Sequence, residues 1–281
     1  MAITTSQLIV DKVIRVTGRD RVSAEPYFIT GQVSDPSLQC DAQEVIKNDA
    51  EGTPIAKWMN AKTAQFSGAE TFWNLDLFSQ QLNGEDKTIG TTGNGVIVPL
   101  TDPIKTYSST DTLTTYVLAK PAANVGTEAV PEYKITVCKL NKDGSIKNGG
   151  KFTLTTGSVA AGKFTYDSTT HTLTFQEGAI AVGDRLFVQY DYNSEDCVAI
   201  FDSADKFPKN MEMVVEVICH PVCDPNEAIA GYAIFPNAQL SASVTENLGR
   251  TDTFPFSFSA QQEYCDESKQ LFRLVFPTIS D

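Results

Sequence analysis

The sequence predicts a mainly β protein, a sandwich or barrel with one flanking α-helix and long extended loops. Short runs of alternating apolar and polar residues recur along the chain, and turn-forming residues separate them. Only one segment has helical spacing. Frequent strands with few helices between them are typical of sandwiches and barrels.

The strand signals of the first two thirds of the chain are residues 10–16, 133–138, 163–166, 172–175 and 185–192. The turn sequence Asn141-Lys142-Asp143-Gly144 predicts a hairpin after the second run. The polar residues 167–170 predict another hairpin between the third and fourth runs. In the fifth run, alternation places Leu186, Val188, Tyr190 and Tyr192 on one face.

The last third of the chain continues the alternation. It places Glu212 and Glu216 on the opposite face of a strand from the apolar set Met211, Met213, Val215, Val217 and Cys219. Further strand signals are residues 232–235, 254–258 and 271–276.

One segment has the spacing of an amphipathic helix, with Phe72, Leu75, Phe78 and Leu82 on one face. Ser67-Gly68-Ala69-Glu70 has the form of a capping box, and Gly84 is placed to end the helix. We expect about four helical turns packed against a sheet.

Two stretches lack strand signals. Residues 34–60 contain Asp35-Pro36, Asn48-Asp49-Ala50-Glu51-Gly52 and Pro54, and they predict a long polar excursion. Loops of that length often contact a partner. Residues 84–106 are rich in Gly, Thr and Pro and predict a second extended connection.

Composition and charge limit the classes of function. The formal net charge is −13, with 22 Lys and Arg against 35 Asp and Glu, so a sequence-reading nucleic-acid binder is not expected. No apolar run is long enough to span a bilayer, and residues 1–6 do not resemble a signal peptide. We therefore expect a protein made in a cytoplasm, with reduced thiols at Cys40, Cys138, Cys197, Cys219, Cys223 and Cys265.

The sequence contains no catalytic motif and two histidines, His171 and His220. A pair of carboxylates for glycoside hydrolysis has no sequence signature, and nothing selects such a pair among the 35 acids. We therefore expect no enzyme, no catalytic residues and no cofactor.

The strongest candidate for a metal-binding motif is Cys219-His220-Pro221-Val222-Cys223, with Cys265 as a further candidate ligand. Its spacing is close to that of zinc sites, but no second matching pair of cysteines exists. Cys219 also falls in register with the apolar residues of its strand. We therefore interpret these residues as reduced core or loop thiols and predict no metal site.

Aromatic side chains offer a binding alternative, with Trp58, Trp73, Tyr190 and Tyr192 as candidates to line a sugar-binding face. Trp73 lies in the expected helix, and the two tyrosines lie on an apolar strand face, so core packing explains them better. Trp58 lies in the polar excursion, where an interface role is expected.

The order of these parts resembles the major tail tube proteins of long-tailed bacteriophages over nearly the whole chain. The match rests on a first strand, the excursion 34–60, the sequence 62–78 that leads into the helix, Gly183–Tyr192 followed by Phe207-Pro208-Lys209, and finally 234–240 and 253–258.

The resemblance implies one β domain over residues 1–281, with an elaborated outer β region at about 100–180. In that family six copies form a ring, and rings stack into a tube in the virion tail after assembly in the host cytoplasm. The lumen tends to be acidic, so viral DNA passes without specific binding. The tape measure and tail terminator proteins would be further partners.

The resemblance also implies roles for particular residues. Asn48, Asp49, Glu51 and Trp58 lie where the family's inter-ring loop would be, and Glu212 and Glu216 are candidates to face the lumen. Two alternatives stay open: another virion structural protein, such as a capsid decoration or baseplate hub component, or a carbohydrate-binding β module.

Overall fold

The computed structural model describes residues 7–127, 129–222, 225–245, 249, 253–262 and 269–277. These residues form a mainly β protein with one short helix, which confirms the predicted fold class. The chain divides into two compact units, with residues 1–87 and 200–281 in unit 1 and residues 88–199 in unit 2. The region 100–180, which was predicted to be an elaborated outer part of a single domain, lies within unit 2.

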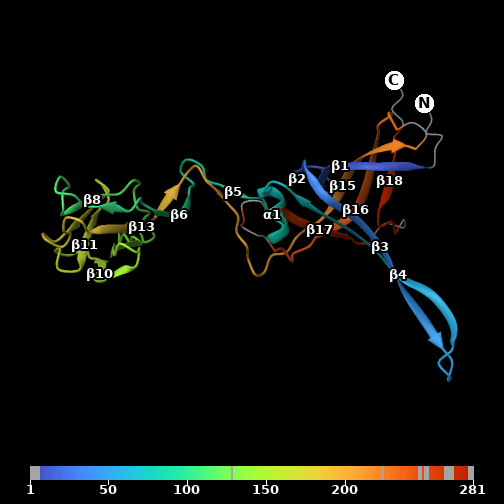
Figure 1. The fold of residues 1–281 in the computed structure, drawn as a ribbon, viewed down its shortest axis with the longest axis horizontal. Coiled ribbons are helices and arrows are strands. Elements are labelled where there is room, and N and C mark those ends of the chain that lie inside the picture. Colours follow the sequence, from blue (N-terminus) through green and yellow to red (C-terminus); the bar gives the residue numbers. More distant parts are fainter. Residues whose placement is uncertain are drawn as a thin grey trace. The chain divides into compact units, whose positions relative to one another are not determined.

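Unit 1 is built on one eight-stranded antiparallel sheet that curls into a half-barrel (Figure 1). Its strands are β1 (Leu8–Arg19), β2 (Pro26–Thr30), β3 (Val33–Asn48), β4 (Pro54–Glu70), β15 (Asn210–Pro221), β16 (Ile229–Leu240), β17 (Phe254–Ala260) and β18 (Arg273–Val275). The order is β2–β1–β15–β16–β17–β4–β3, and β18 pairs with β16. The two outermost strands, β2 and β3, are consecutive in the chain.

One face of this sheet forms the core of unit 1. Along β15, Met211, Met213 and Val215 are almost completely buried, which confirms the face that alternation predicted. Phe258 of β17 stacks on Phe66 of β4 with ring centroids 5.2 Å apart. Each such buried side chain contributes roughly 1.5–3 kcal/mol of hydrophobic stabilisation, so this face holds the sheet in its curled form.

The helix α1 (Leu75–Leu82) is shorter than predicted and begins later. Its N-cap is Asn74, whose side-chain oxygen accepts hydrogen bonds from the amides of Asp76 and Leu77, both at 3.2 Å. The predicted capping box at Ser67 and Glu70 is wrong, because both residues belong to β4 and pair with β17. The helix ends before Gly84, as predicted.

The prediction of a strand-poor excursion at residues 34–60 is wrong. β3 and β4 pair with each other from Val33 and Glu70 out to Asn48 and Pro54, so this stretch is a long β-hairpin. Its polar side chains lack the apolar alternation by which a strand is recognised, because most of the hairpin has no buried face.

Unit 2 is a second eight-stranded sheet with the order β6–β13–β9–β10–β11–β12–β8, with β7 paired to β13. Its elements are β5 (Thr88–Ile89), β6 (Val96–Thr101), β7 (Lys105–Thr106), β8 (Thr115–Val117), β9 (Ile135–Leu140), β10 (Ile146–Leu154), β11 (Lys163–Asp167), β12 (Thr172–Phe175), β13 (Arg185–Ser194) and β14 (Val198–Ala199). Both predicted hairpins are present, β9–β10 and β11–β12. The expected connection at 84–106 instead contains three strands, β5, β6 and β7.

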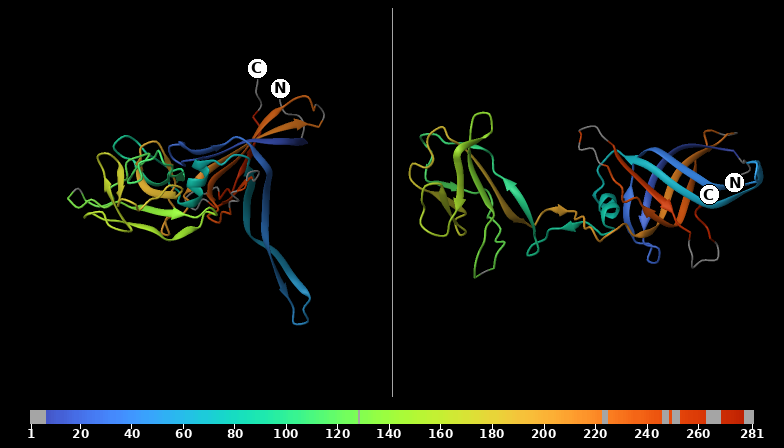
Figure 2. Two further views of the ribbon diagram at one scale, coloured as in Figure 1. Left: turned by 60° about the vertical axis from the view of Figure 1, so that its left-hand side comes forward. Right: turned by 90° about the horizontal axis from the view of Figure 1, so that it is seen from below.

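Strand β5 pairs with β14, so the chain enters and leaves unit 2 through two adjacent segments (Figure 2). Inside the unit, Leu186, Val188 and Tyr190 are buried on one face of β13, as alternation predicted. The hydroxyl of Tyr190 donates a hydrogen bond of 3.2 Å to Asp102, a carboxylate that is itself only 3% exposed. This polar contact fixes β13 against the segment that follows β6.

A partly buried ion-pair network closes the other end of β13. Asp184 is 2.7 Å from the Lys139 amine and 3.1 Å from that of Lys147, and it accepts a hydrogen bond from the Ala181 amide. Burial alone would raise the pKa of Asp184, but the hydrogen bonds from Lys139, Ala181 and Lys147 outweigh it and lower the pKa to about 2.

This network predicts a pH-dependent part of the stability of unit 2. Because the pKa of Asp184 is lower in the folded state, its contribution is complete above the ordinary carboxyl value of about 3.9 and is lost as pH falls toward 2. We expect Asp184→Asn to lower the free energy of unfolding at neutral pH by about 2 kcal/mol, measured by denaturant unfolding. The exposed control Glu177→Gln should leave it nearly unchanged, and an unaltered acid dependence in the Asn variant would contradict the assignment.

Candidate assembly surfaces

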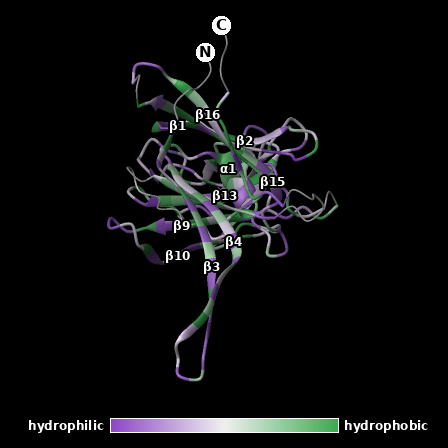
Figure 3. Ribbon diagram, turned by 90° about the vertical axis from the view of Figure 1, so that its right-hand side faces the viewer, coloured by the Kyte–Doolittle hydropathy of each residue, from purple (hydrophilic) through white to green (hydrophobic). Residues whose placement is uncertain are grey.

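The hairpin of β3 and β4 extends beyond the rest of the sheet as a two-stranded arm, defined as residues 41–63 (Figure 3). β17 pairs with β4 only between Gln65 and Glu70. The buried residue of β4 that lies nearest to the turn is Ala64. None of the 23 residues of the arm is buried. Eight residues of extended chain reach about 25 Å, so the arm carries its turn well away from the core of unit 1.

The predicted contact residues lie at and near the end of the arm. Asp49 holds the turn itself, because its carboxylate accepts hydrogen bonds from the amides of Glu51 at 2.9 Å and Thr53 at 2.7 Å. Asn48 lies opposite Pro54 at the last step of the ladder, and Glu51 is exposed. The turn is therefore tightly defined by its own hydrogen bonds.

Both faces of the arm carry exposed apolar side chains, because Ile46 and Met59 are the register partners of Lys57 and Glu44. Trp58 lies directly opposite Val45, and its side chain is 49% exposed. The neighbouring Lys57 projects from the other face, where its amine is 2.8 Å from Glu44. Other exposed apolar side chains of the arm are Ile46, Ile55 and Met59. The arm thus presents apolar surface with no core of its own to cover it.

Both long edges of the arm are free within the described part of the chain. β3 is the last strand of the sheet, and in the arm β4 pairs only with β3. Unpaired backbone N–H and C=O groups on an extended edge can pair with a strand of another chain. Geometry and composition therefore both make the arm a candidate surface for association.

The two predicted lumen residues lie together on the outward face of the sheet, but each has an arginine partner. Glu212 is 3.0 Å from the Nε of Arg19, and Glu216 is 3.6 Å from that of Arg15. The hydrogen bond to Glu212 raises the pKa of Arg19 above its usual range. These pairs could not be predicted from the sequence, because β1 and β15 are far apart in the chain.

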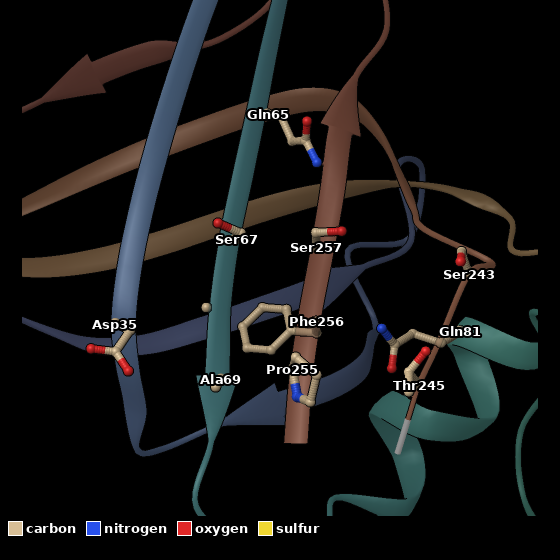
Figure 4. Close-up of a pocket in the computed structure, with 11 residues that line it drawn as sticks. Asp35, Gln65, Ser67, Ala69, Gln81, Ser243, Thr245, Pro255, Phe256 and Ser257 are labelled. Carbon is tan, nitrogen blue, oxygen red and sulfur yellow. The ribbon is translucent and has the colours of Figure 1, made fainter. Parts of the chain in front are cut away.

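A shallow hollow of about 410 Å3 lies over β4 and β17 at one end of α1 (Figure 4). Its lining combines hydroxyl and amide side chains with Ala69, Pro255 and Phe256 and a single carboxylate, Asp35. A second hollow, of about 690 Å3 in unit 2, is lined in part by Tyr133 and Tyr166. Neither lining includes a histidine or a cysteine among the described residues.

The two candidate zinc ligands that the structure describes, Cys219 and His220, lie on opposite faces of β15. Cys219 is buried in the core face of β15, and burial raises the pKa of its thiol. His220, the next residue of the strand, lies on the opposite face, with its Nδ1 2.9 Å from the Glu227 carbonyl oxygen. Cys223 and Cys265 lie outside the described residues. Among those described, no three His, Cys, Asp or Glu side chains form a group able to hold a metal ion.

The other aromatic candidates contribute to packing. Trp73 stacks on Phe254 with ring centroids 5.8 Å apart, and Tyr190 is 1% exposed. Of the four side chains considered for sugar binding, Trp58 alone lies on the arm.

The single described helix has eight residues, and no helix in the described part of the chain is long and apolar enough to cross a bilayer. A comparison with models of known protein families finds no match, and a comparison with curated proteins finds none either.

The placement of Cys219 generates a prediction about metal. We expect the purified protein to contain no stoichiometric zinc and a strong chelator to leave its melting temperature unchanged. Cys219→Ala should cost only the packing of a small buried side chain, about 1 kcal/mol, and Cys223→Ser should have almost no effect. Elemental analysis showing one zinc per chain would overturn this interpretation and make Cys219, His220 and Cys223 ligands.

Proposed function

We propose that this chain is a structural subunit that self-assembles into stacked rings and forms the tail tube of a long-tailed phage. Such a tube conducts viral DNA during ejection and requires no catalytic residues or cofactor. The observation that carries the proposal is the arm, a two-stranded extension whose side chains find no core within unit 1.

The physics of a two-stranded ribbon supports self-association. An isolated hairpin is marginally stable in water, and stable sheets need three or more strands or a packed face. The arm has free edges and exposes Ile46, Ile55, Trp58 and Met59. Contact with another copy would bury these side chains and would pair the free backbone N–H and C=O groups along the edges.

The roles of the predicted residues follow from this proposal. The end of the arm, with Asn48, Asp49, Glu51 and Trp58, contacts a subunit of the neighbouring ring. The curled sheet of unit 1 contributes to the ring, which is hexameric in the family that the chain resembles, with the face of Glu212 and Glu216 toward the lumen. The tape measure and tail terminator proteins are partners, and the tail of the virion is the location.

Shortening the arm tests the proposal. Ala42 and Lys62 are register partners, so replacing residues 43–61 by Asn-Gly joins them through a two-residue turn. Because none of the removed residues is buried, we expect the variant to fold with nearly the parent melting temperature but to form no tubes in electron micrographs. Tubes of normal length from this variant would contradict the role of the arm.

A pair of point variants separates the arm from exposed aromatic surface in general. Trp58→Ala should reduce polymerisation, measured by sedimentation, at least about ten-fold, because an interfacial tryptophan often contributes 2 kcal/mol or more. Phe72 is also an exposed aromatic of unit 1, but it lies off the arm. Phe72→Ala should therefore polymerise like the parent, and equal effects of the two changes would argue against a contact at the arm.

A further inference from the structure

The part of the outward face of the unit 1 sheet formed by β1, β15, β16 and β18 carries more cations than carboxylates, although the chain as a whole has a formal net charge of −13. Residues opposite one another in an antiparallel sheet share a face, so the register of β1, β15, β16 and β18 identifies the outward residues. Its charged members are Lys12, Arg15, Arg19, Glu212, Glu216 and Arg273. At the register positions of these four strands, four cations therefore stand against two carboxylates, and the exposed Asp11 lies in the bulge beside Lys12.

The cations are arranged in a line. Lys12, Arg15 and Arg19 follow one another along β1 on the same face, over about 20 Å of extended strand. Arg273 lies on the same face of β18, opposite Ile234 of β16. A linear row of cations suits a linear polyanion, whose phosphates also repeat along one direction.

The ion pairs leave the arginines accessible. The side chains of Arg15 and Arg19 are 52% and 37% exposed, whereas those of Glu216 and Glu212 are 22% and 18% exposed. Ion pairs at the surface contribute little, so a phosphate approaching from solvent can compete with each carboxylate for its guanidinium. Elsewhere the excess of acidic residues repels a polyanion.

We infer that this face contacts the phosphate backbone of duplex DNA, and that Glu212 and Glu216 keep the contact weak by occupying Arg19 and Arg15. The inference rests on the proposed conduit function for its biological meaning, since DNA that must move through a tube cannot be held tightly. It also changes the role of the two glutamates: they act as partners of arginines on a basic face, and not as free repelling charges.

The test is binding of a short fluorescent DNA duplex, followed by anisotropy at several salt concentrations. Glu212→Gln with Glu216→Gln frees two arginines without a change of shape. We expect binding about ten-fold tighter or more at low salt, with a salt dependence steeper by about 0.9 for each freed arginine that meets a phosphate. Adding Lys12→Gln and Arg273→Gln to that variant should reverse most of the gain.

A matched control separates this face from net charge. Asp76→Asn with Glu85→Gln also removes two negative charges, and it frees Lys87 and Lys206, which lie elsewhere in unit 1. The control should bind DNA like the parent. An equal gain in the control, or no gain in the Glu212 and Glu216 variant, would overturn the inference.

The same samples are examined by sedimentation, which keeps the inference separate from the proposed function. A gain in DNA binding by protein that forms no tubes supports the DNA contact and contradicts the tube. Tubes with no gain contradict the DNA contact alone. If the Glu212 and Glu216 variant instead loses self-association and gains no DNA binding, the face is covered by another copy of the chain and the inference is wrong.

Discussion

The constraint that organises unit 1 is the point at which β3 and β4 leave their core. Up to Ala64 and Phe66, these strands belong to a curled sheet whose inner face is sealed by Phe235, Phe256 and Phe258. Beyond that point the same two strands continue as a ribbon with solvent on both faces. A ribbon of this kind gains little from its own contacts, so its length and exposed apolar side chains make sense when another molecule covers it.

On the opposite face of the sheet, two ion pairs neutralise part of the surface charge. Arg15 and Arg19 of β1 meet Glu216 and Glu212 of β15, so the strand pairing that builds the sheet also neutralises part of its surface. Core and surface therefore depend on one register: a slip of one residue between β1 and β15 would expose Val16 and separate both ion pairs. The inward apolar face fixes this register, and the outward ion pairs follow from it.

Much of the fold was predictable because burial leaves a periodic signal. Met211, Met213 and Val215 recur at every second position, between Glu212, Val214 and Glu216, because one face of β15 is buried. The arm has no buried face and hence no such period, which is why residues 34–60 were interpreted as a loop. Ser67 and Glu70 imitate a capping box but are paired in β4. The partner of Glu212 lies 193 residues away, so only the folded sheet reveals it.

The central claim is that the arm is completed by another copy of the chain, and hydrogen exchange of its backbone amides tests this most directly. In dilute protein the amides on the free edges of residues 41–63 should exchange rapidly, while those of β15 and β16 stay protected. As the concentration rises and the protein self-associates, protection should appear in the arm. Rapid exchange of the arm in assembled protein, or full protection in the monomer, would contradict the account.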